Sequence, residues 1–390
     1  MSELYKLPDG WVWKKLGTVL NVQNGYAFDS KLFSEETGVQ LIRIRDLKNG
    51  FKTVSKFTGS YDKKFIVRKN DFLIGMDGDF VCYQWKGENS LLNQRVCRLI
   101  DFDFSLNANY IFYGINKFLD DIHKITAFVT VKHISSKQIK EINFPIPPLK
   151  EQKRIVSKLD TLFDKIDKSI ALHVENIKDA DAFMGSVLNE TFTELEEKYT
   201  TSPLFEVADV SRGKSKHRPR NDKRLFGGKY PFIQTGNVRN ADKYITTYTN
   251  TYSEFGLAQS KLWKKGTICM TIAANIGDVA ILGMDSCFPD SVVGLYSEKN
   301  SNDYLYFFLQ TLKQHLESKA TTTAQMNINL KVLQTIAVPL PSLLEQEKIV
   351  EYLNEMFEKV ETLKSVQKEK MESLVALKAS ILDKAFRGEL

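Results

Sequence analysis

The sequence contains the same unit twice, and this duplication restricts the fold more than any other feature of the chain. A shift of 194 residues places Pro145–Ile166 over Pro339–Val360, and ten of the 22 aligned positions are identical. The same shift aligns Tyr110 with Tyr304 upstream, and the register continues downstream over about eighty residues in all. A chance match would not hold one register for that distance. The chain therefore consists of two copies of one structural unit.

Nearer the N-terminus of each copy the shift varies by a few residues, as insertions in surface loops would cause. Gly25 lies over Gly213 at a shift of 188, and residues 93–96 lie over 289–292 at a shift of 196. Each copy thus has about 190 residues, and the junction between the copies lies near Glu196–Pro203.

The first part of each copy has the pattern of a mixed domain. Residues 1–148 contain short apolar or alternating runs, such as LIRIR and DFLIG, separated by Gly, Asn and Asp, which is typical of strands joined by turns. Residues 107–122 instead carry apolar side chains at helical spacing. The mixture predicts an α+β fold for residues 1–148 and, by the duplication, for 198–342.

A long helix is predicted after each α+β domain, over residues 149–197 and 343–390. Apolar residues recur there in steps of three and four, near the heptad period of a coiled coil. In the second copy Ser342 and Glu345 form a capping box, which places the start of the helix just after Pro341.

A helix of about forty residues is roughly 60 Å long, so one small domain cannot cover its apolar stripe. We expect the two helices to pair with each other as an antiparallel coiled coil; the alternative is that each helix binds another chain. The residues predicted to form the pairing are Ile155, Leu159, Leu162, Ile166, Ile349, Leu353, Met356 and Val360.

Composition excludes several classes of protein. No run of eighteen apolar residues occurs, so a membrane-spanning helix is not expected, and Met1–Lys15 lacks the pattern of a signal peptide. The four cysteines form no C-x-x-C pair, which indicates free thiols in a reducing cytoplasm instead of disulfides or a zinc site. The net charge of +6 is weak evidence for a polyanionic partner.

No catalytic motif is recognisable in the sequence. A phosphate-binding loop, a G-x-G-x-x-G turn, an aromatic N-P-P or D-P-P loop, H-E-x-x-H and G-x-S-x-G are all absent, and the five histidines are scattered. Asp77 and Asp79 lie beside glycines, where a turn between strands explains them better than a metal site. We therefore expect that the chain does not catalyse a reaction by itself and binds no cofactor or metal.

One segment, residues 211–224, is strongly basic and reads SRGKSKHRPRNDKR. The segment contains seven cationic residues and a single acidic residue, Asp222. Because Gly213 and Pro219 disfavour a helix, the segment is predicted to be a basic loop. Such a loop can neutralise phosphates and place an arginine fork against guanine; the alternative is a solvated loop without a ligand. The candidate DNA-binding residues in it are Arg212, Lys214, Lys216, His217, Arg218, Arg220, Lys223 and Arg224.

The corresponding segment of the first copy, Gln23–Lys31, is not basic, so the two domains are expected to bind different DNA sequences. Arg43, Arg45 and the pair Gln94–Arg95 are equally compatible with a contact to DNA and with neutralisation of internal carboxylates. The further candidates for DNA contact are Arg43, Arg45, Gln94, Arg95, Lys132 and His133 in the first copy, and Gln234, Asn237 and Arg239 in the second.

Together these motifs resemble the specificity subunits of type I restriction-modification systems. The matching features are LPDGW at Leu7–Trp11, the doubled P-x-P-x-x-x-E-Q signature before each long helix, KAFRGEL at Lys384–Leu390, and the basic segment with the residues after it, Arg212–Val238. The resemblance covers essentially the whole chain.

The resemblance implies that each α+β domain is a target-recognition domain that binds one half of a bipartite site in double-stranded DNA. It also implies that the paired helices set the gap between the half-sites and dock two modification subunits, which carry S-adenosylmethionine and methylate adenine N6. Restriction subunits, which use ATP and Mg²⁺, would add translocation and cleavage. Two alternatives remain open: a self-sufficient DNA methyltransferase or nuclease, and a coiled-coil scaffold that does not bind DNA.

Overall fold

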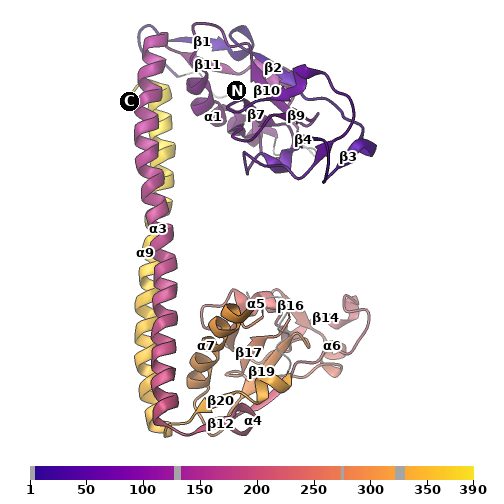
Figure 1. Cartoon of the computed structure of the whole chain (residues 1–390), viewed down its shortest axis with the longest axis vertical. Coiled ribbons are helices and arrows are strands. Elements are labelled where there is room, and N and C mark those ends of the chain that lie inside the picture. The colour runs from indigo at the N-terminus through magenta and orange to yellow at the C-terminus, as the bar shows by residue number, and fades with distance from the viewer. Residues whose placement is uncertain (1–4, 127–132, 274–275, 321–329) are drawn as a thin grey trace. The chain divides into compact units, whose positions relative to one another are not determined.

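The computed structural model describes residues 5–126, 133–273, 276–320 and 330–390. The chain divides into two compact units, which are Met1–Leu172 with Lys370–Leu390 (unit 1) and His173–Glu369 (unit 2). Each unit holds one α+β domain, the beginning of one long helix and the end of the other (Figure 1). The predicted fold class is confirmed. The two units are defined by contacts between residues. The boundaries predicted at residues 148, 197 and 342 were instead placed where the secondary structure changes, so those boundaries stay a prediction.

The domain of unit 1 contains two larger sheets. One has the order β2-β10-β7-β8 with antiparallel neighbours, and the other has the order β3-β5-β4-β9-β6 with β4 and β9 parallel. The strands are β2 Asn21–Asn24, β3 Phe33–Ser34, β4 Val39–Ile42, β5 Lys56–Phe57, β6 Ile66–Val67, β7 Phe72–Gly75, β8 Cys82–Gln84, β9 Ser90–Leu92 and β10 Val96–Ile100. The helices are η1 Leu16–Thr18, η2 Ser30–Leu32, η3 Ile44–Asp46, η4 Lys63–Phe65, α1 Ala108–Thr126 and α2 Ser136–Lys140.

The domain of unit 2 repeats the central part of this design. Its main sheet has the order β13-β19-β17-β18-β15, whose first four strands correspond in order to β2-β10-β7-β8, and β14 pairs with β16. The strands are β13 Asp209–Arg212, β14 Phe226–Phe232, β15 Tyr244–Ile245, β16 Asn250–Tyr252, β17 Ile268–Thr271, β18 Val279–Leu282 and β19 Val292–Tyr296. The helices are α4 Leu204–Val207, η5 Lys223–Leu225, α5 Thr235–Arg239, α6 Glu254–Ala258, α7 Asn302–Ala320 and α8 Leu330–Gln334.

One helix of each domain packs on the central sheet. The apolar face of α1, with Tyr110, Ile111, Ile115 and Leu119, is buried in the same core as strands β2, β7 and β10. Helix α7 has the same place in unit 2, where its buried residues join β13, β17 and β19. The helix predicted over residues 107–122 is confirmed by α1, because helical spacing puts its apolar residues on one face.

A small sheet leads from each domain into its long helix. In unit 1 β1, Val12–Lys15, pairs antiparallel with β11, Asn143–Ile146, and in unit 2 β12, Thr201–Pro203, pairs with β20, Ala337–Pro339. The hydroxyl of Tyr110 donates to the carbonyl of Pro145 at 3.0 Å. Tyr304, its partner in the repeat, donates to Pro339 at 2.8 Å.

The glutamine of the doubled sequence signature locks each long helix to its domain. Gln152 is fully buried; its Nε2 donates to the carbonyls of Ser105 and Pro147 at 3.0 and 2.8 Å, and its Oε1 accepts from the N–H of Asn107 at 2.7 Å. Gln346 is also buried: its Nε2 donates to the carbonyl of Pro341 and to the side-chain Oδ1 of Asn300, both at 3.1 Å, and its Oε1 accepts from the N–H of Ser301 at 3.0 Å. A buried amide must find such partners, so the signature fixes the start of the helix.

The two long helices are α3, Leu149–Lys198, and α9, Leu343–Arg387. The capping box predicted for α9 is confirmed: the N–H of Glu345 donates to Ser342 Oγ, and the N–H of Ser342 donates to Glu345 Oε2. The helices have 50 and 45 residues and so exceed the forty expected from the apolar stripe.

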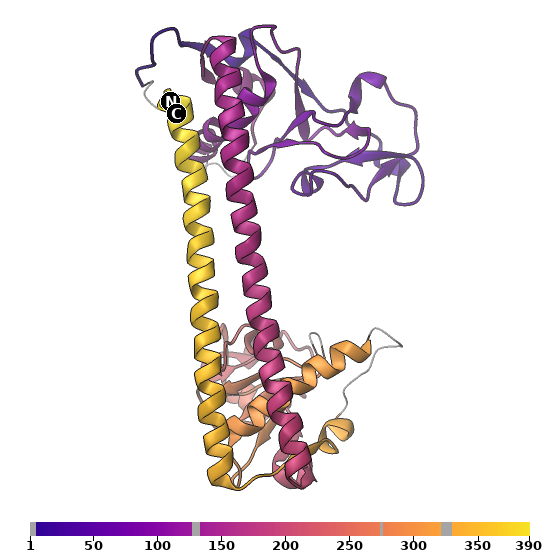
Figure 2. The same cartoon turned by 60° about the vertical axis from the view of Figure 1, so that its left-hand side comes forward.

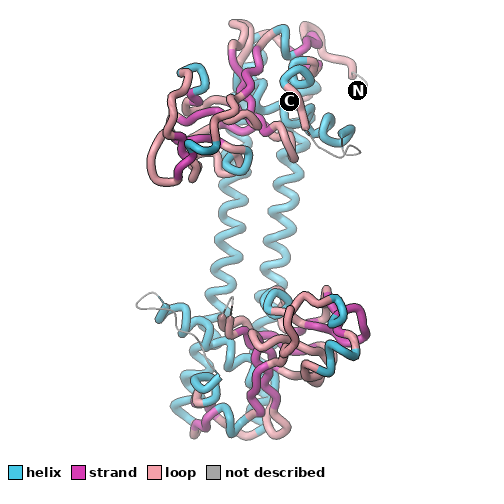
Figure 3. The backbone as a smooth tube through the Cα atoms, turned by 90° about the vertical axis from the view of Figure 1, so that its right-hand side faces the viewer, coloured by secondary structure: helices cyan, strands magenta, loops and turns pink. Residues whose placement is uncertain are grey.

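In each unit α3 and α9 run side by side in opposite directions (Figures 2 and 3). Lys378 pairs with Asp167 at 2.7 Å in unit 1, and Lys364 pairs with Asp181 at 2.8 Å in unit 2. As the residue number rises along α3 it falls along α9, which is the pairing of an antiparallel coiled coil.

The C-terminal end of each long helix packs in the domain of the other copy. Phe386 of α9 contacts the rings of Tyr110 and Phe144 in unit 1, with centroids 4.9 and 5.6 Å apart. Phe192 of α3 lies 5.4 Å from the ring of Tyr304 in unit 2. This burial explains the extra length of the helices, because their last turns are stabilised by a core and do not fray.

Within the residues that the structure describes, no helix is both long enough and apolar enough to cross a bilayer.

Candidate nucleic-acid interface

The same end of the central sheet brings polar loops together in both units. In unit 1 the pairs Asn24–Cys97 and Gly75–Val96 show that β2 and β7 end where β10 begins. The loops there touch: a Cβ on Gly25 would lie 2.0 Å from the carbonyl oxygen of Asn93, so only glycine fits. The matching Gly213 of unit 2 would clash in the same way with the carbonyls of Phe288 and Pro289.

In unit 1 this sheet end carries a cluster of three charged or polar side chains. Asp77 Oδ2 lies 3.3 Å from Nη1 of Arg95, and Asp77 Oδ1 lies 2.6 Å from Nδ1 of His133. The fold thus brings together two residues that were predicted separately to contact DNA, and the exposed Gln94 lies next to Arg95. Asp77 therefore contacts both side chains, whereas the sequence indicated only that it lies in a turn between strands. The candidate Lys132 lies outside the described residues.

The basic loop of unit 2 starts at the same end of its sheet. Arg212 ends β13, and Arg220 reaches back to Asp290 in the loop before β19, where Nη2 donates to both carboxylate oxygens at 2.9 and 3.0 Å. This ion pair connects the basic loop with the loop that precedes β19. Arg218 folds onto its own loop, since its Nη1 donates to the carbonyls of Ser215 and His217.

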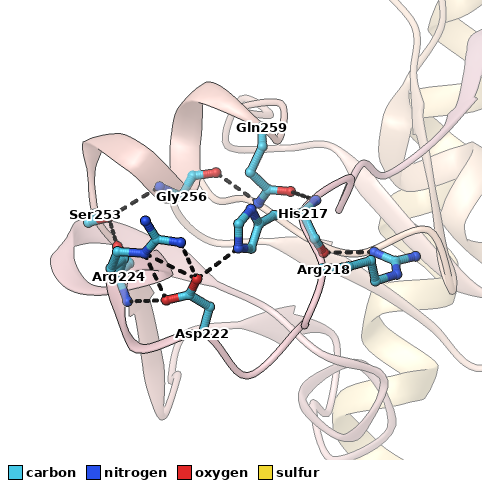
Figure 4. Close-up of polar contacts among 7 residues, drawn as sticks. All are labelled: His217, Arg218, Asp222, Arg224, Ser253, Gly256 and Gln259. Carbon is cyan, nitrogen blue, oxygen red and sulfur yellow. Dashed lines mark hydrogen bonds and ion pairs between the residues drawn. The ribbon is translucent and has the colours of Figure 1, made fainter.

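The far part of the basic loop is held by a network around Asp222 (Figure 4). Oδ1 of Asp222 accepts from the N–H of Arg224 at 3.0 Å, Oδ2 accepts from Arg224 Nη2 at 2.7 Å, and His217 Nε2 lies 2.8 Å from Oδ2. The bonds from Arg224, with that from His217, hold the pKa of Asp222 well below its usual range, so the carboxylate stays ionised.

A second set of bonds ties this network to α6. The N–H of His217 donates to Gln259 Oε1 at 2.9 Å, and Gln259 Nε2 donates to the carbonyl of Gly256 at 2.9 Å. Ser253 Oγ donates to the carbonyl of Arg224 at 2.6 Å. His217, Asp222 and Arg224 are therefore held in place on this part of the loop.

Arg43 and Arg45 converge on one hydroxyl. Nη1 of Arg43 and Nη2 of Arg45 lie 3.4 and 3.2 Å from Ser55 Oγ, and Nε of Arg45 lies 4.0 Å from the buried carboxylate of Asp46. Arg43 is half-buried and Arg45 is exposed. Arg45 thus lies beside an internal carboxylate and is also exposed to solvent, and its contact with DNA stays a prediction.

The three remaining candidates of unit 2 lie on or beside α5. Asn237 Oδ1 accepts from the N–H of Gln234 at 2.9 Å, and Asp46 makes the same bond to Arg43 in unit 1. Asn237 therefore caps a helix, and Gln234 is exposed at the start of that helix. Arg239 lines a cavity of about 550 Å³ between the domain and the two long helices of unit 2.

The residues predicted to pair the helices lie in the cores of the two units. Ile155, Leu159 and Ile166 are buried in the core of unit 1, and Leu162 packs against it. In unit 2 Leu353 and Val360 are buried, and Ile349 and Met356 pack beside them. These positions face their own domains as well as the opposite helix.

Sequence reasoning missed the acidic partners of the basic residues. Asp222 was noted only as the single counter-charge of the basic loop, and Asp290 was not singled out. The ring of Phe255, whose centre lies 5.1 Å from the guanidinium carbon of Arg224, was also missed. One signal was present for Asp222: an isolated acid two residues before an arginine can cap a turn and hold that arginine.

The buried thiols and the acidic residues do not form a metal site in the described ranges. No group of three His, Cys, Asp or Glu side chains there is close enough to hold an ion. All four cysteines are buried, and burial raises the pKa of Cys97 to about 12.

Comparison with known proteins identifies the family. The model of the type I restriction modification DNA specificity domain matches residues 8–176 and again residues 196–372. The chain belongs to this family. Both matches contain one α+β domain and the beginning of the long helix that follows it.

Relatives and solved structures of this family resemble the chain over nearly its full length. The chain is 28% identical to the type I restriction enzyme EcoBI specificity subunit of Escherichia coli over 100% of this chain and 88% of that protein, and 24% identical to the EcoKI specificity subunit of Escherichia coli K12 over 99% and 90%. A structure described as the basis of complex assembly and conformational transition of the type I R-M system has a TM-score of 0.73 and 25% identity, covering 99% of this chain and 100% of that one. The HsdS subunit from Thermoanaerobacter tengcongensis shares the fold, with a TM-score of 0.52, 23% identity and coverage of 100% and 99%.

Proposed function

We propose that the chain is the DNA-recognition specificity subunit of a type I restriction-modification complex and that each domain binds one half of a bipartite target. The proposal rests on the polar side chains at one end of the central sheet in each unit. Equivalent strands present unlike polar side chains there, namely the Arg95–Asp77–His133 cluster in unit 1 and the basic loop in unit 2. One scaffold with two different sets of donors and acceptors fits two different base sequences.

The charges of the basic loop suit double-stranded DNA. Arg212, Lys214, Lys216 and Lys223 form no ion pair with any residue that the structure describes, and all four are exposed. Such side chains can replace counterions along a phosphate backbone, whereas arginines with fixed forks can bind base edges.

The long helices have a separate role in the proposal. They set the number of unspecified base pairs between the half-sites and dock two modification subunits. Those subunits would bring S-adenosylmethionine and methylate adenine N6, and restriction subunits would bring ATP and Mg²⁺, so the specificity subunit itself is non-catalytic and acts in the cytoplasm. The names of the relatives as specificity subunits of type I restriction enzymes support this assignment.

Mapping of methylated sites tests the proposal. Genomes from strains with and without the gene, compared by methylome sequencing, should differ by one bipartite motif. Exchange of Arg218 and Arg220 for Ala should weaken or relax one half of that motif, by about 1–3 kcal/mol for each lost base contact. Exchange of Arg43 and Arg45 for Ala should affect only the other half.

The matched controls are the Lys double variants at the same positions, which keep the charge and lose the fork. The modular proposal is wrong if either Ala double variant alters both halves equally. Methyl transfer by the isolated chain would instead establish the alternative of a self-sufficient enzyme. Failure of the chain to bind any DNA would support the alternative of a coiled-coil scaffold.

A further inference from the structure

The seven cations of the basic loop fall into two groups. The guanidinium groups of Arg218, Arg220 and Arg224 have hydrogen-bond partners, whereas the other four cations have none in the described part of the chain. Unpaired, exposed cations suit the phosphates of the backbone, because a phosphate requires charge and little directional geometry. Positioned arginines suit a partner that demands a fixed geometry.

Arg224 is the most firmly positioned of the three. Its Nε lies 3.2 and 3.1 Å from the two oxygens of Asp222, and its Nη2 lies 2.7 Å from Oδ2, so one edge of the guanidinium is bound in two places (Figure 4). Its guanidinium carbon lies 5.1 Å from the centre of the Phe255 ring. The side chain is nevertheless 70% exposed. Arg220 is bound through Nη2 alone.

The donors that remain on Arg224 form a second fork. A guanidinium has five N–H groups, and the bonds to Asp222 occupy the edge made by Nε and Nη2. The opposite edge, made by Nη1 and the second hydrogen of Nη2, has no acceptor among the described residues. Two parallel donors match the O6 and N7 acceptors of guanine in the major groove.

The charge of the pair also selects among ligands. Asp222 and Arg224 together are neutral, so their attraction for a phosphate is small compared with that of Lys214 or Lys216. A base edge needs oriented donors more than net charge, and an arginine that is already held loses less side-chain entropy when it binds.

We propose that Arg224, positioned by Asp222, reads a guanine in the half-site of the second recognition domain, while the unpaired lysines of the loop hold phosphates. This inference rests on the proposed function and adds to it the identity of a base-reading residue.

The experiment uses the complex assembled with its modification subunits and a pool of randomised DNA duplexes, from which bound sequences are selected and sequenced. Arg224→Lys keeps the charge and removes the fork. It should lower the preference for guanine at one position of one half-site by about tenfold or more, and it should leave the salt dependence of binding unchanged. Lys216→Ala should do the opposite: the slope of log K against log salt falls by about 0.9 and base preference stays.

Asp222→Asn tests the positioning residue. Asparagine caps a helical turn as well as aspartate does, so the turn is retained while Arg224 loses its ionic partner. The preference for guanine at the same position should weaken, but by less than in Arg224→Lys. The thermal midpoint of unfolding should stay close to that of the wild type. The neutral amide cannot replace the lost carboxylate charge, so wild-type preference in this variant contradicts the positioning role.

The outcomes separate this inference from the proposed function. If the wild-type complex selects no sequence, the proposed function itself fails. If it selects a bipartite motif and Arg224→Lys leaves every base preference unchanged, the proposal for Arg224 alone is overturned. A uniform loss of affinity in Arg224→Ala, with a reduced salt slope and no change of motif, also overturns it, because Arg224 would then contact a phosphate.

Discussion

Replacement of Gln152 by Leu should destabilise unit 1 by about 3–6 kcal/mol. Leucine fills nearly the same volume, so the packing changes little, but three backbone groups lose their partner: the N–H of Asn107 and the carbonyls of Ser105 and Pro147. A buried polar group left without a partner costs about 1–3 kcal/mol, and the carbonyls fall at the lower end because a second lone pair can find another donor. The loss is a large part of the stability of an ordinary domain.

Hydrogen exchange followed by mass spectrometry is the appropriate assay, since it reports the two units separately. In Gln152→Leu protection should fall in α1 and in the first turns of α3, while segments within unit 2 keep their protection. Gln346→Leu should lower protection in unit 2 instead, because it removes two bonds to backbone groups and one bond to the side-chain oxygen of Asn300. Lys153→Leu is the control. Lys153 is exposed at the next position of α3, so this substitution should change the free energy of unfolding by no more than about 0.5 kcal/mol.

A difference of less than about 1 kcal/mol between the free energies of unfolding of Gln152→Leu and Lys153→Leu in urea would contradict the role assigned to Gln152. That role is also refuted if the loss of protection is the same in both units. Gln152→Glu supplies a further check with almost the same shape, since it turns the donor that faces two carbonyls into an acceptor. This variant should lose at least as much stability as the leucine variant.

Two further predictions concern the chain as a subunit. The purified chain should show no methylation or cleavage of DNA when it is incubated with S-adenosylmethionine, or with ATP and Mg²⁺, and turnover by the chain alone would overturn the assignment. Four helix-favouring residues inserted after Lys178 lengthen α3 by about 6 Å and turn it by roughly 400°, so the apolar stripe nearly returns to its face. At about 3.4 Å per base pair, the mapped gap between the half-sites should grow by one or two base pairs with both half-sites unchanged. Two inserted residues turn the stripe by about 200° and should unfold the pairing, and an unaltered gap in an active four-residue variant would mean that the helices do not measure the spacing.

The duplication, the fold class and the long helices could all be predicted from the amino-acid sequence. The fold class and the long helices follow from local rules, since apolar spacing and the Ser342–Glu345 cap each act within a few residues. The signature that ends in Gln152 and Gln346 was visible as a repeat. Its role was not visible, because the atoms that each glutamine binds include groups some 45 residues away.

The candidate site was predictable only as a list of basic residues. Sequence patterns identified Arg95 and His133 one by one. The antiparallel register of β7 and β10 places Arg95 beside Asp77, and an isolated antiparallel bridge between Asp77 and His133 brings the histidine to the same carboxylate. In the basic loop the seven cations are equivalent as long as only the sequence is considered. The tertiary structure distinguished them, because whether a cation is paired depends on acids and rings brought from elsewhere in the chain, such as Asp290 and Phe255.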